Sequence, residues 1–137
     1  MMKHILNNIF SFIMTGLVYI IGGFDVAMKC LLVVMIIDYI SGIASAIYNK
    51  KLNSKIGFKG IIKKIAYFLA IGLAVRVDNL TGTSGIIRNI IIYFFVANDG
   101  LSIIENMGEM GIKLPKKLID VLEQLKEKDN GDDKNDI

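Results

Sequence analysis

The sequence has few of the residues from which catalytic and metal centres are built. Cys30 is the only cysteine and His4 the only histidine among 137 residues. A single cysteine excludes an internal disulfide and a thiolate metal cluster, and in an apolar run it is typical of a small packed hydrophobe. His4 lies near the amino end, away from any nucleophile that it could activate. We therefore expect no enzyme activity, no metal and no cofactor.

Arginine is almost as scarce as cysteine. Only Arg76 and Arg88 are present, and both lie inside apolar blocks. A basic domain that binds nucleic acid usually mixes arginine and aromatic residues into its basic run. Here the net charge of +3 comes mainly from lysine. The sequence therefore gives no reason to expect a nucleic-acid partner.

Charge of either sign is rare in the first 49 residues. The charged residues of this stretch are Lys3, Asp25, Lys29 and Asp38. In the whole chain 53% of residues are hydrophobic and 21% are charged. Long apolar blocks alternate with short charged segments, and this segregation is typical of a protein that crosses a membrane.

Four apolar blocks indicate an all-α membrane protein with four transmembrane helices. They cover about residues 5–24, 26–48, 61–80 and 86–104. The first holds 20 residues without a charge, enough to cross a hydrocarbon core of roughly 30 Å. No small-x-small cleavage site follows it, so we expect a retained helix rather than a signal peptide. A protein with three spans and one block on the membrane surface is the alternative, because the last two blocks carry charges near their ends.

The charged segments predict how these spans are oriented. Residues 49–64 hold six lysines and no acid, and lysine in short loops marks the cytoplasmic side of a membrane. With four spans in residues 1–110, both termini then lie in the cytoplasm. Residues 111–128 have leucines at helical spacing and predict an amphipathic helix that lies on the membrane or pairs with a second copy. Residues 129–137 have little to bury and are expected to be disordered.

Two of the spans are expected to carry polar faces. On the 26–48 helix, i, i+3, i+4, i+7 and i+11 spacing groups Asp38, Ser41, Gly42, Ser45 and Asn49. On the 86–104 helix and just beyond it, a second stripe holds Asn98, Asp99, Ser102, Glu105 and Asn106. Small and polar residues let helices approach closely within a bilayer. We expect these faces to form contacts between helices or subunits, or to line a water-filled hole.

Asp38 and Asp99 are costly residues at these positions. An ionised aspartate at the centre of a transmembrane helix costs about 2.5–3.5 kcal/mol on insertion scales. Arg76 is the nearest cation within the expected spans, and it is expected to pair either with one of these acids or locally with Asp78. We hypothesise that Asp38 couples protonation to assembly. Four such helices enclose no wide lumen, so a large hole needs a homo-oligomer.

Three segments in this order resemble the toxin-secretion and phage-lysis holin family of Gram-positive hosts. They are DYISG (38–42), KKLNSKIGFKGIIKKI (50–65) and SIIENMGEMGIKLPKKL (102–118), and the resemblance covers residues 28–125. It implies motif positions at Asp38, Ser41, Gly42, Asn53, Ser54, Gly57, Gly60, Lys64, Ser102, Glu105, Asn106 and Pro115. It also implies a protein that oligomerises in the host cytoplasmic membrane and opens a timed lesion for an endolysin or a large toxin.

Two functional alternatives remain open from the sequence. Lysis and toxin export require almost the same protein, so the residues do not separate them. A small ion or proton channel, or a transporter subunit, is the alternative from a different class, with the intramembrane acids and Arg76 as its path. No inverted repeat or pair of broken helices supports it.

Overall fold

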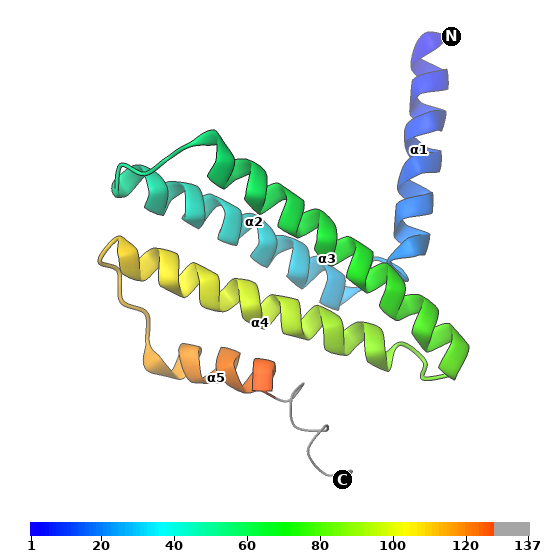
Figure 1. The fold of residues 1–137 in the computed structure, drawn as a ribbon. Helices are drawn as coiled ribbons and strands as arrows, with labels where there is room; N and C mark the ends of the chain where they lie inside the picture. Colours follow the sequence, from blue (N-terminus) through cyan, green and yellow to red (C-terminus); the bar gives the residue numbers. More distant parts are fainter. Residues whose placement is uncertain (128–137) are drawn as a thin grey trace.

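A computed structural model describes residues 1–127 as five helices (Figure 1). They are α1 (Met2–Ile20), α2 (Val26–Tyr48), α3 (Ser54–Thr81), α4 (Ile86–Glu109) and α5 (Lys116–Glu127). The expected all-α fold is therefore confirmed. The tail predicted to be disordered, 129–137, lies outside the described residues.

Helices α2, α3 and α4 lie side by side and form the body of the molecule (Figure 1). The chain runs in one direction along α2 and α4 and in the opposite direction along α3, because short turns join consecutive helices. The core is a row of side chains from all three helices: Met28, Leu31, Met35, Tyr67, Ile71 and Ile92. The loop at 49–53 and the end of α4 consequently lie at one end of the bundle, and the turn at 82–85 lies at the other.

Side-chain caps fix where α2 and α3 begin. The Asp25 carboxylate accepts a hydrogen bond of 3.0 Å from the backbone N–H of Met28, and Asn53 accepts one of 3.0 Å from Ile56. Such caps satisfy N–H groups that have no partner within the first turn of a helix. Asn53, a motif residue of the predicted cytoplasmic loop, therefore sets the start of α3.

The first turn of α4 is capped by an acid of another helix. Gly85 precedes α4 and has no side chain to act as a cap. Asp78 of α3 instead accepts hydrogen bonds from backbone N–H groups in the first turn of α4. Its carboxylate accepts hydrogen bonds of 3.0 Å from Ile87 N and 2.8 Å from Arg88 N, and one from the Thr83 hydroxyl. Asp78 is thus engaged in the α3–α4 turn, and the local pair with Arg76 that the sequence allowed is not formed.

Replacing Asp78 by alanine is expected to lower the free energy of unfolding by about 1–2 kcal/mol, because the first turn of α4 loses its cap. Denaturant titration of the protein in detergent measures this change. Asp120→Ala, which removes an exposed acid of α5, is the matched control. Equal stability of the two variants would contradict the capping role.

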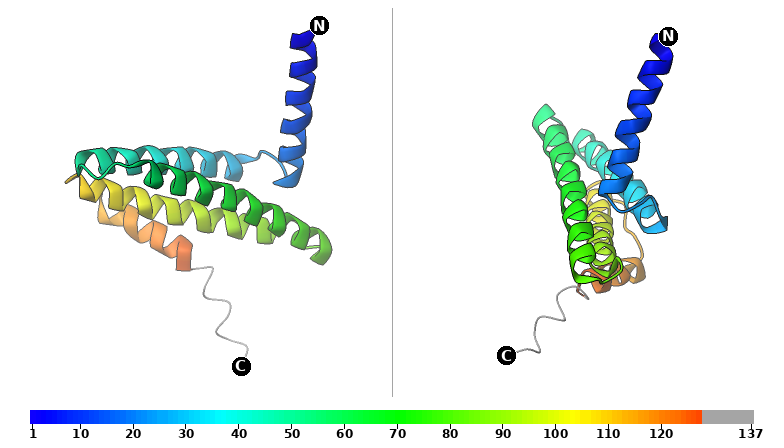
Figure 2. Two further views of the ribbon diagram at one scale, coloured as in Figure 1. Left: turned by 45° about the horizontal axis from the view of Figure 1, so that its top comes forward. Right: turned by 90° about the vertical axis from the view of Figure 1, so that its right-hand side faces the viewer.

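Helix α5 packs against α4 and runs back along it (Figures 1 and 2). The two helices are in close contact at Gly100, where a β-carbon would lie 2.8 Å from a methyl group of Leu122. The predicted amphipathic helix is therefore present, but it begins at Lys116 rather than at 111. Leu122 of this helix contacts α4, whereas Leu118, Val121 and Leu125 are exposed, so the contact with a membrane surface or a second copy stays a prediction.

Two of the helices are long and apolar enough to cross a membrane. Among the described residues these are α2 and α4, with 23 and 24 residues. The structure therefore supports two of the four expected spans, α2 and α4, by length and composition. Helix α1 differs most from the expectation, because it leaves the bundle at a steep angle and none of its residues is buried (Figure 2).

Candidate functional site

A vestibule lined by both polar and apolar residues enters the bundle from the end that carries the loop at 49–53. It consists of two adjoining cavities, of about 270 and 400 Å³, which share Gly42, Ile56 and Asn106 in their linings. Asn49 and Lys51 line the outer cavity, whereas Asp38 and Lys64 line the inner one. Asp38, Gly42, Ser45 and Asn49 of the predicted polar face therefore line this space, whereas Ser41 does not.

The inner end of the vestibule is a cluster of three charged side chains. The Lys64 ammonium donates to an Asp38 oxygen at 2.5 Å and also donates to Asp99. Asp99 is fully buried, and the side chains of Asp38 and Lys64 are only 12% and 13% exposed. One lysine thus forms ion pairs with two acids from two other helices. In a weakly polar interior this arrangement is far more favourable than two separated carboxylates.

Uncharged groups complete the hydrogen bonding of Asp99. Its second oxygen accepts a hydrogen bond of 2.8 Å from the Tyr67 hydroxyl, which in turn accepts one of 2.9 Å from the Asn98 amide. The Tyr67 ring stacks on Phe95, with ring centroids 3.8 Å apart. The carboxylate is therefore held in a fixed position by α3 and α4.

Nearer the mouth, the polar residues of α2 pair with those of α4. The Asn106 amide donates to the Ser41 hydroxyl at 2.9 Å, and the Ser45 hydroxyl donates to the Glu109 carboxylate. Ser41 and Ser45 are buried. A β-carbon on Gly42 would lie 3.6 Å from the Asn106 amide, an ordinary contact distance. The two predicted polar stripes therefore face each other.

The two glycines of the loop motif provide space for Tyr39. A β-carbon on Gly57 would lie 3.3 Å from the Tyr39 hydroxyl, and one on Gly60 would lie 3.3 Å from its ring. Larger residues at these positions would push α3 away from α2. Gly57 and Gly60 thus belong to the start of α3 and to one wall of the vestibule, rather than to a loop.

Other predicted residues are divided between the vestibule and the surface. Ser102 lines the inner cavity. Glu105 is exposed and lines neither cavity. Ser54 is the first residue of α3, and Pro115 directly precedes α5.

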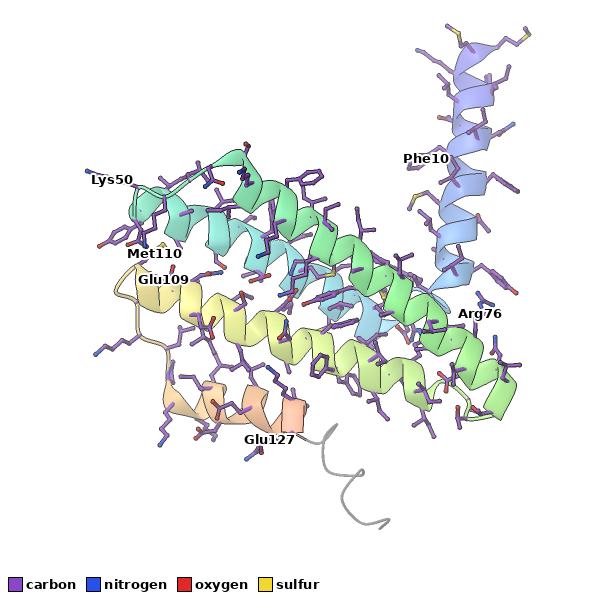
Figure 3. All side chains as sticks on the ribbon, in the orientation of Figure 1. Phe10, Lys50, Arg76, Glu109, Met110 and Glu127 are labelled. Carbon is purple, nitrogen blue, oxygen red and sulfur yellow. The ribbon has the colours of Figure 1, made fainter. Side chains whose placement is uncertain are left out.

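Arg76 pairs with neither Asp38 nor Asp99. Its guanidinium lies 5.0 Å from the centre of the Tyr19 ring, near the base of α1 (Figure 3). The cation that the acids use is Lys64 of α3. Among the described residues, the expected ion pair between Arg76 and Asp38 or Asp99 is therefore wrong.

Tyr67 and Glu109 are site residues that the sequence analysis missed. Glu109 continues the α4 stripe of Asp99, Ser102 and Asn106 at i, i+3, i+7 and i+10. Helical spacing could have selected it in place of Glu105, which lies off that line. Tyr67 lies three residues after Lys64, on the same side of α3, but an aromatic residue at that spacing is normally read as core.

Comparison with known proteins gives one consistent result. The model of the bacteriophage holin family matches residues 15–127. A protein of Bacillus phage phi105 named as a probable holin is 35% identical over 100 residues, which cover 73% of each chain. An uncharacterised protein of Listeria monocytogenes is 41% identical over 100 residues, 73% of this chain and 71% of its own.

A third relative spans nearly the whole length. An uncharacterised 14.9 kDa protein of Clostridium perfringens is 34% identical over 131 residues, which cover 90% of this chain and 99% of that protein. No solved structure matches the chain. The matched residues include all of α2, α3, α4 and α5, and therefore the whole vestibule.

Proposed function

Because the chain belongs to the bacteriophage holin family, we propose that it oligomerises in the host cytoplasmic membrane and opens a lesion large enough for a folded protein. The family permeabilises membranes without enzymatic chemistry. The lesion would release an endolysin that degrades the cell wall or, in a toxin locus, a large toxin. The accumulating protein would set the time at which the lesion opens.

One observation carries this proposal: the polar faces of α2 and α4 are turned toward each other inside a closed bundle. Ser41 and Ser45 are satisfied by Asn106 and Glu109 of the same chain. Asp38 and Lys64 of the charged cluster line the inner cavity, next to these paired faces. If the helices separated, the same polar faces would be available to line a water-filled hole made by many copies.

The proposed topology follows from the bundle and from the lysines. Helices α2, α3 and α4 would cross the membrane, with the loop at 49–53 and the carboxyl end on the cytoplasmic side. Lysines 50, 51, 55 and 59 gather at that end of the bundle, where the positive-inside rule expects them. Figure 3 shows Lys50 and Glu109 at the same end of the molecule.

The decisive experiment is the efflux of cytoplasmic reporters of graded mass after induced expression. The proposal expects small solutes and folded proteins to leave together, with an abrupt loss of membrane potential. A small ion or proton channel is the second candidate, because a cluster of titratable groups, two of which line the vestibule, lies inside the bundle. It predicts ion flux with full retention of folded proteins, and that result would refute the lesion.

Replacing Asp38 by asparagine is expected to advance the onset of permeabilisation. The change leaves Asp99 paired with Lys64 but removes a charge-assisted bond between α2 and α3, a class of interaction that contributes about 1.5–3 kcal/mol. The closed bundle should then separate earlier at the same amount of protein in the membrane. Reporter efflux, timed against quantified expression, measures the shift.

Asp120→Asn is the control for this prediction, because it removes the charge of an exposed acid on α5. If Asp38→Asn, like Asp120→Asn, keeps the onset and extent of the unaltered protein, the Asp38–Lys64 pair does not hold the bundle closed.

A further inference from the structure

Helix α1 has two unlike faces. His4, Asn8, Ser11 and Thr15 follow one another at spacings of four, three and four, so they share one side of the helix. The opposite side carries large apolar residues, and Ile9 and Ile13 there are each 53% exposed. An exposed apolar face of this length marks a surface that another apolar phase covers.

The direction of α1 does not suit a spanning helix. Figure 2 shows α1 leaving the bundle steeply across the direction of α2, α3 and α4. If α2 and α4 cross a bilayer, a helix at this angle runs along the membrane surface. At 1.5 Å per residue, its 19 residues measure about 28 Å, slightly less than a typical hydrocarbon core.

A buried arginine fixes this angle. Arg88 of α4, only 5% exposed, donates from Nε to the Ile21 carbonyl at 2.6 Å and from a terminal nitrogen to the Gly23 carbonyl at 3.0 Å. Its guanidinium also pairs with Asp25 at 2.8 Å. Gly22, between these groups, has φ of +78°, and a β-carbon there would lie 2.9 Å from Val75. The elbow between α1 and α2 is therefore a packed joint.

The inner angle of the elbow is apolar throughout. It holds a cavity of about 490 Å³ whose lining comes from α1, the following turn, α2 and α3, and every lining side chain is apolar. Leu17, Leu32 and Phe68 are among them. Water in such a space would be unfavourable, whereas lipid acyl chains match its lining.

We propose that α1 is an interfacial helix, with its apolar face in the acyl chains of one leaflet and its polar face toward water. It would lie at the end of the bundle that carries the turn at 82–85, opposite the lysine-rich loop. This inference rests on the proposed insertion of α2 and α4. It replaces the expected first span and the cytoplasmic amino end, and it concerns a helix that lies mostly outside the family match, which begins at residue 15.

Spin labels on single cysteines test the proposal. In a Cys30→Ser background, residues 5–14 are labelled in turn in vesicles of phosphatidylcholine and phosphatidylglycerol, and collisions with oxygen and with a water-soluble nickel chelate are measured. An interfacial helix gives a helical oscillation at constant mean depth. Labels at Asn8 and Ser11 then meet the nickel chelate, and labels at Ile9 and Ile13 meet oxygen.

Two other results would overturn the proposal. A spanning helix would favour oxygen at every position, with a maximum near the helix centre. An α1 paired with a second copy would exclude both reagents from Ile9 and Ile13. The measurement needs no lesion, so a failure of the proposed holin function would leave its outcome readable.

A labelling experiment tests the side on which α1 lies. A bulky impermeant maleimide is added to sealed membrane vesicles, where it reacts differently with Ser84→Cys and Lys51→Cys because they lie on opposite sides of the membrane. Lys3→Cys is expected to react like Ser84→Cys. Ser84 lies in the turn between α3 and α4, and Lys51 lies in the lysine-rich loop. Reaction of Lys3→Cys in the manner of Lys51→Cys would place the amino end with that loop and overturn the assignment.

Discussion

Replacing Lys64 by methionine is expected to destabilise the protein by about 3–5 kcal/mol, the usual cost of removing one partner from a buried ion pair. Lys64 lies between Asp38 and Asp99, and no other cation in the described residues forms an ion pair with either acid. Methionine keeps an unbranched apolar side chain of nearly the same length but leaves two acids without compensation. Denaturant titration in detergent, or the yield of folded protein in membranes, measures the loss.

Two variants make this prediction specific to charge. Lys63→Met removes an exposed lysine from the adjacent position and should change the stability by less than about 1 kcal/mol. Adding Asp38→Asn and Asp99→Asn to Lys64→Met removes the uncompensated acids and should recover most of the loss. If Lys64→Met is as stable as Lys63→Met, the cluster does not depend on its lysine.

The polar faces of this site could be predicted because they follow from the period of a single helix. Asp38, Ser41 and Ser45 recur at three and four residues, and that spacing places them together whatever the helix packs against. The partner of a buried charge has no such local signature. Hydropathy divides the chain at its lysines and therefore places Lys64 at the boundary between the lysine-rich segment 49–64 and the expected span 61–80. In the structure α3 begins at Ser54, so Lys64 enters the bundle.

Helix α1 shows the same limit at a larger scale. An uncharged block of 20 residues satisfies a span by length, and counting charges overlooks the polar face of Asn8, Ser11 and Thr15. The three- and four-residue spacing of these side chains could have predicted that α1 has a polar face. The elbow depends on a hydrogen bond between Arg88 and Ile21, which are 67 residues apart in the chain. Only the packing of α4 against the start of α2 brings them together.

Replacing Arg88 by lysine is expected to have the second largest effect, a loss of about 2–4 kcal/mol. The guanidinium donates from three nitrogens to the Ile21 carbonyl, the Gly23 carbonyl and the Asp25 carboxylate at once. A lysine ammonium is a point donor on a flexible stem and cannot hold all three in this geometry. Hydrogen bonds to charged groups contribute about 1.5–3 kcal/mol each, and at least one is lost.

The mobility of α1 distinguishes a role of Arg88 in fixing the direction of α1 from a general contribution to packing. A spin label on α1 should become more mobile in Arg88→Lys, because the elbow no longer fixes the direction of the helix. Arg76→Lys is the matched control, since Arg76 makes a cation–π contact with Tyr19 that contributes about 0.5–1 kcal/mol. Equal mobility in the two variants would show that Arg88 does not hold the elbow.

The pH dependence of this difference has a definite sign. The hydrogen bond from Arg88 lowers the pKa of Asp25 below its usual value of 3.8. A carboxyl with a lowered pKa contributes stability that is present above the usual value and is lost as the pH falls through the lowered one. The stability difference between the unaltered protein and Arg88→Lys should therefore stay constant from pH 7 to about pH 5 and shrink below about pH 4. A difference that already shrinks between pH 7 and pH 5 would assign the stabilisation to a group other than Asp25.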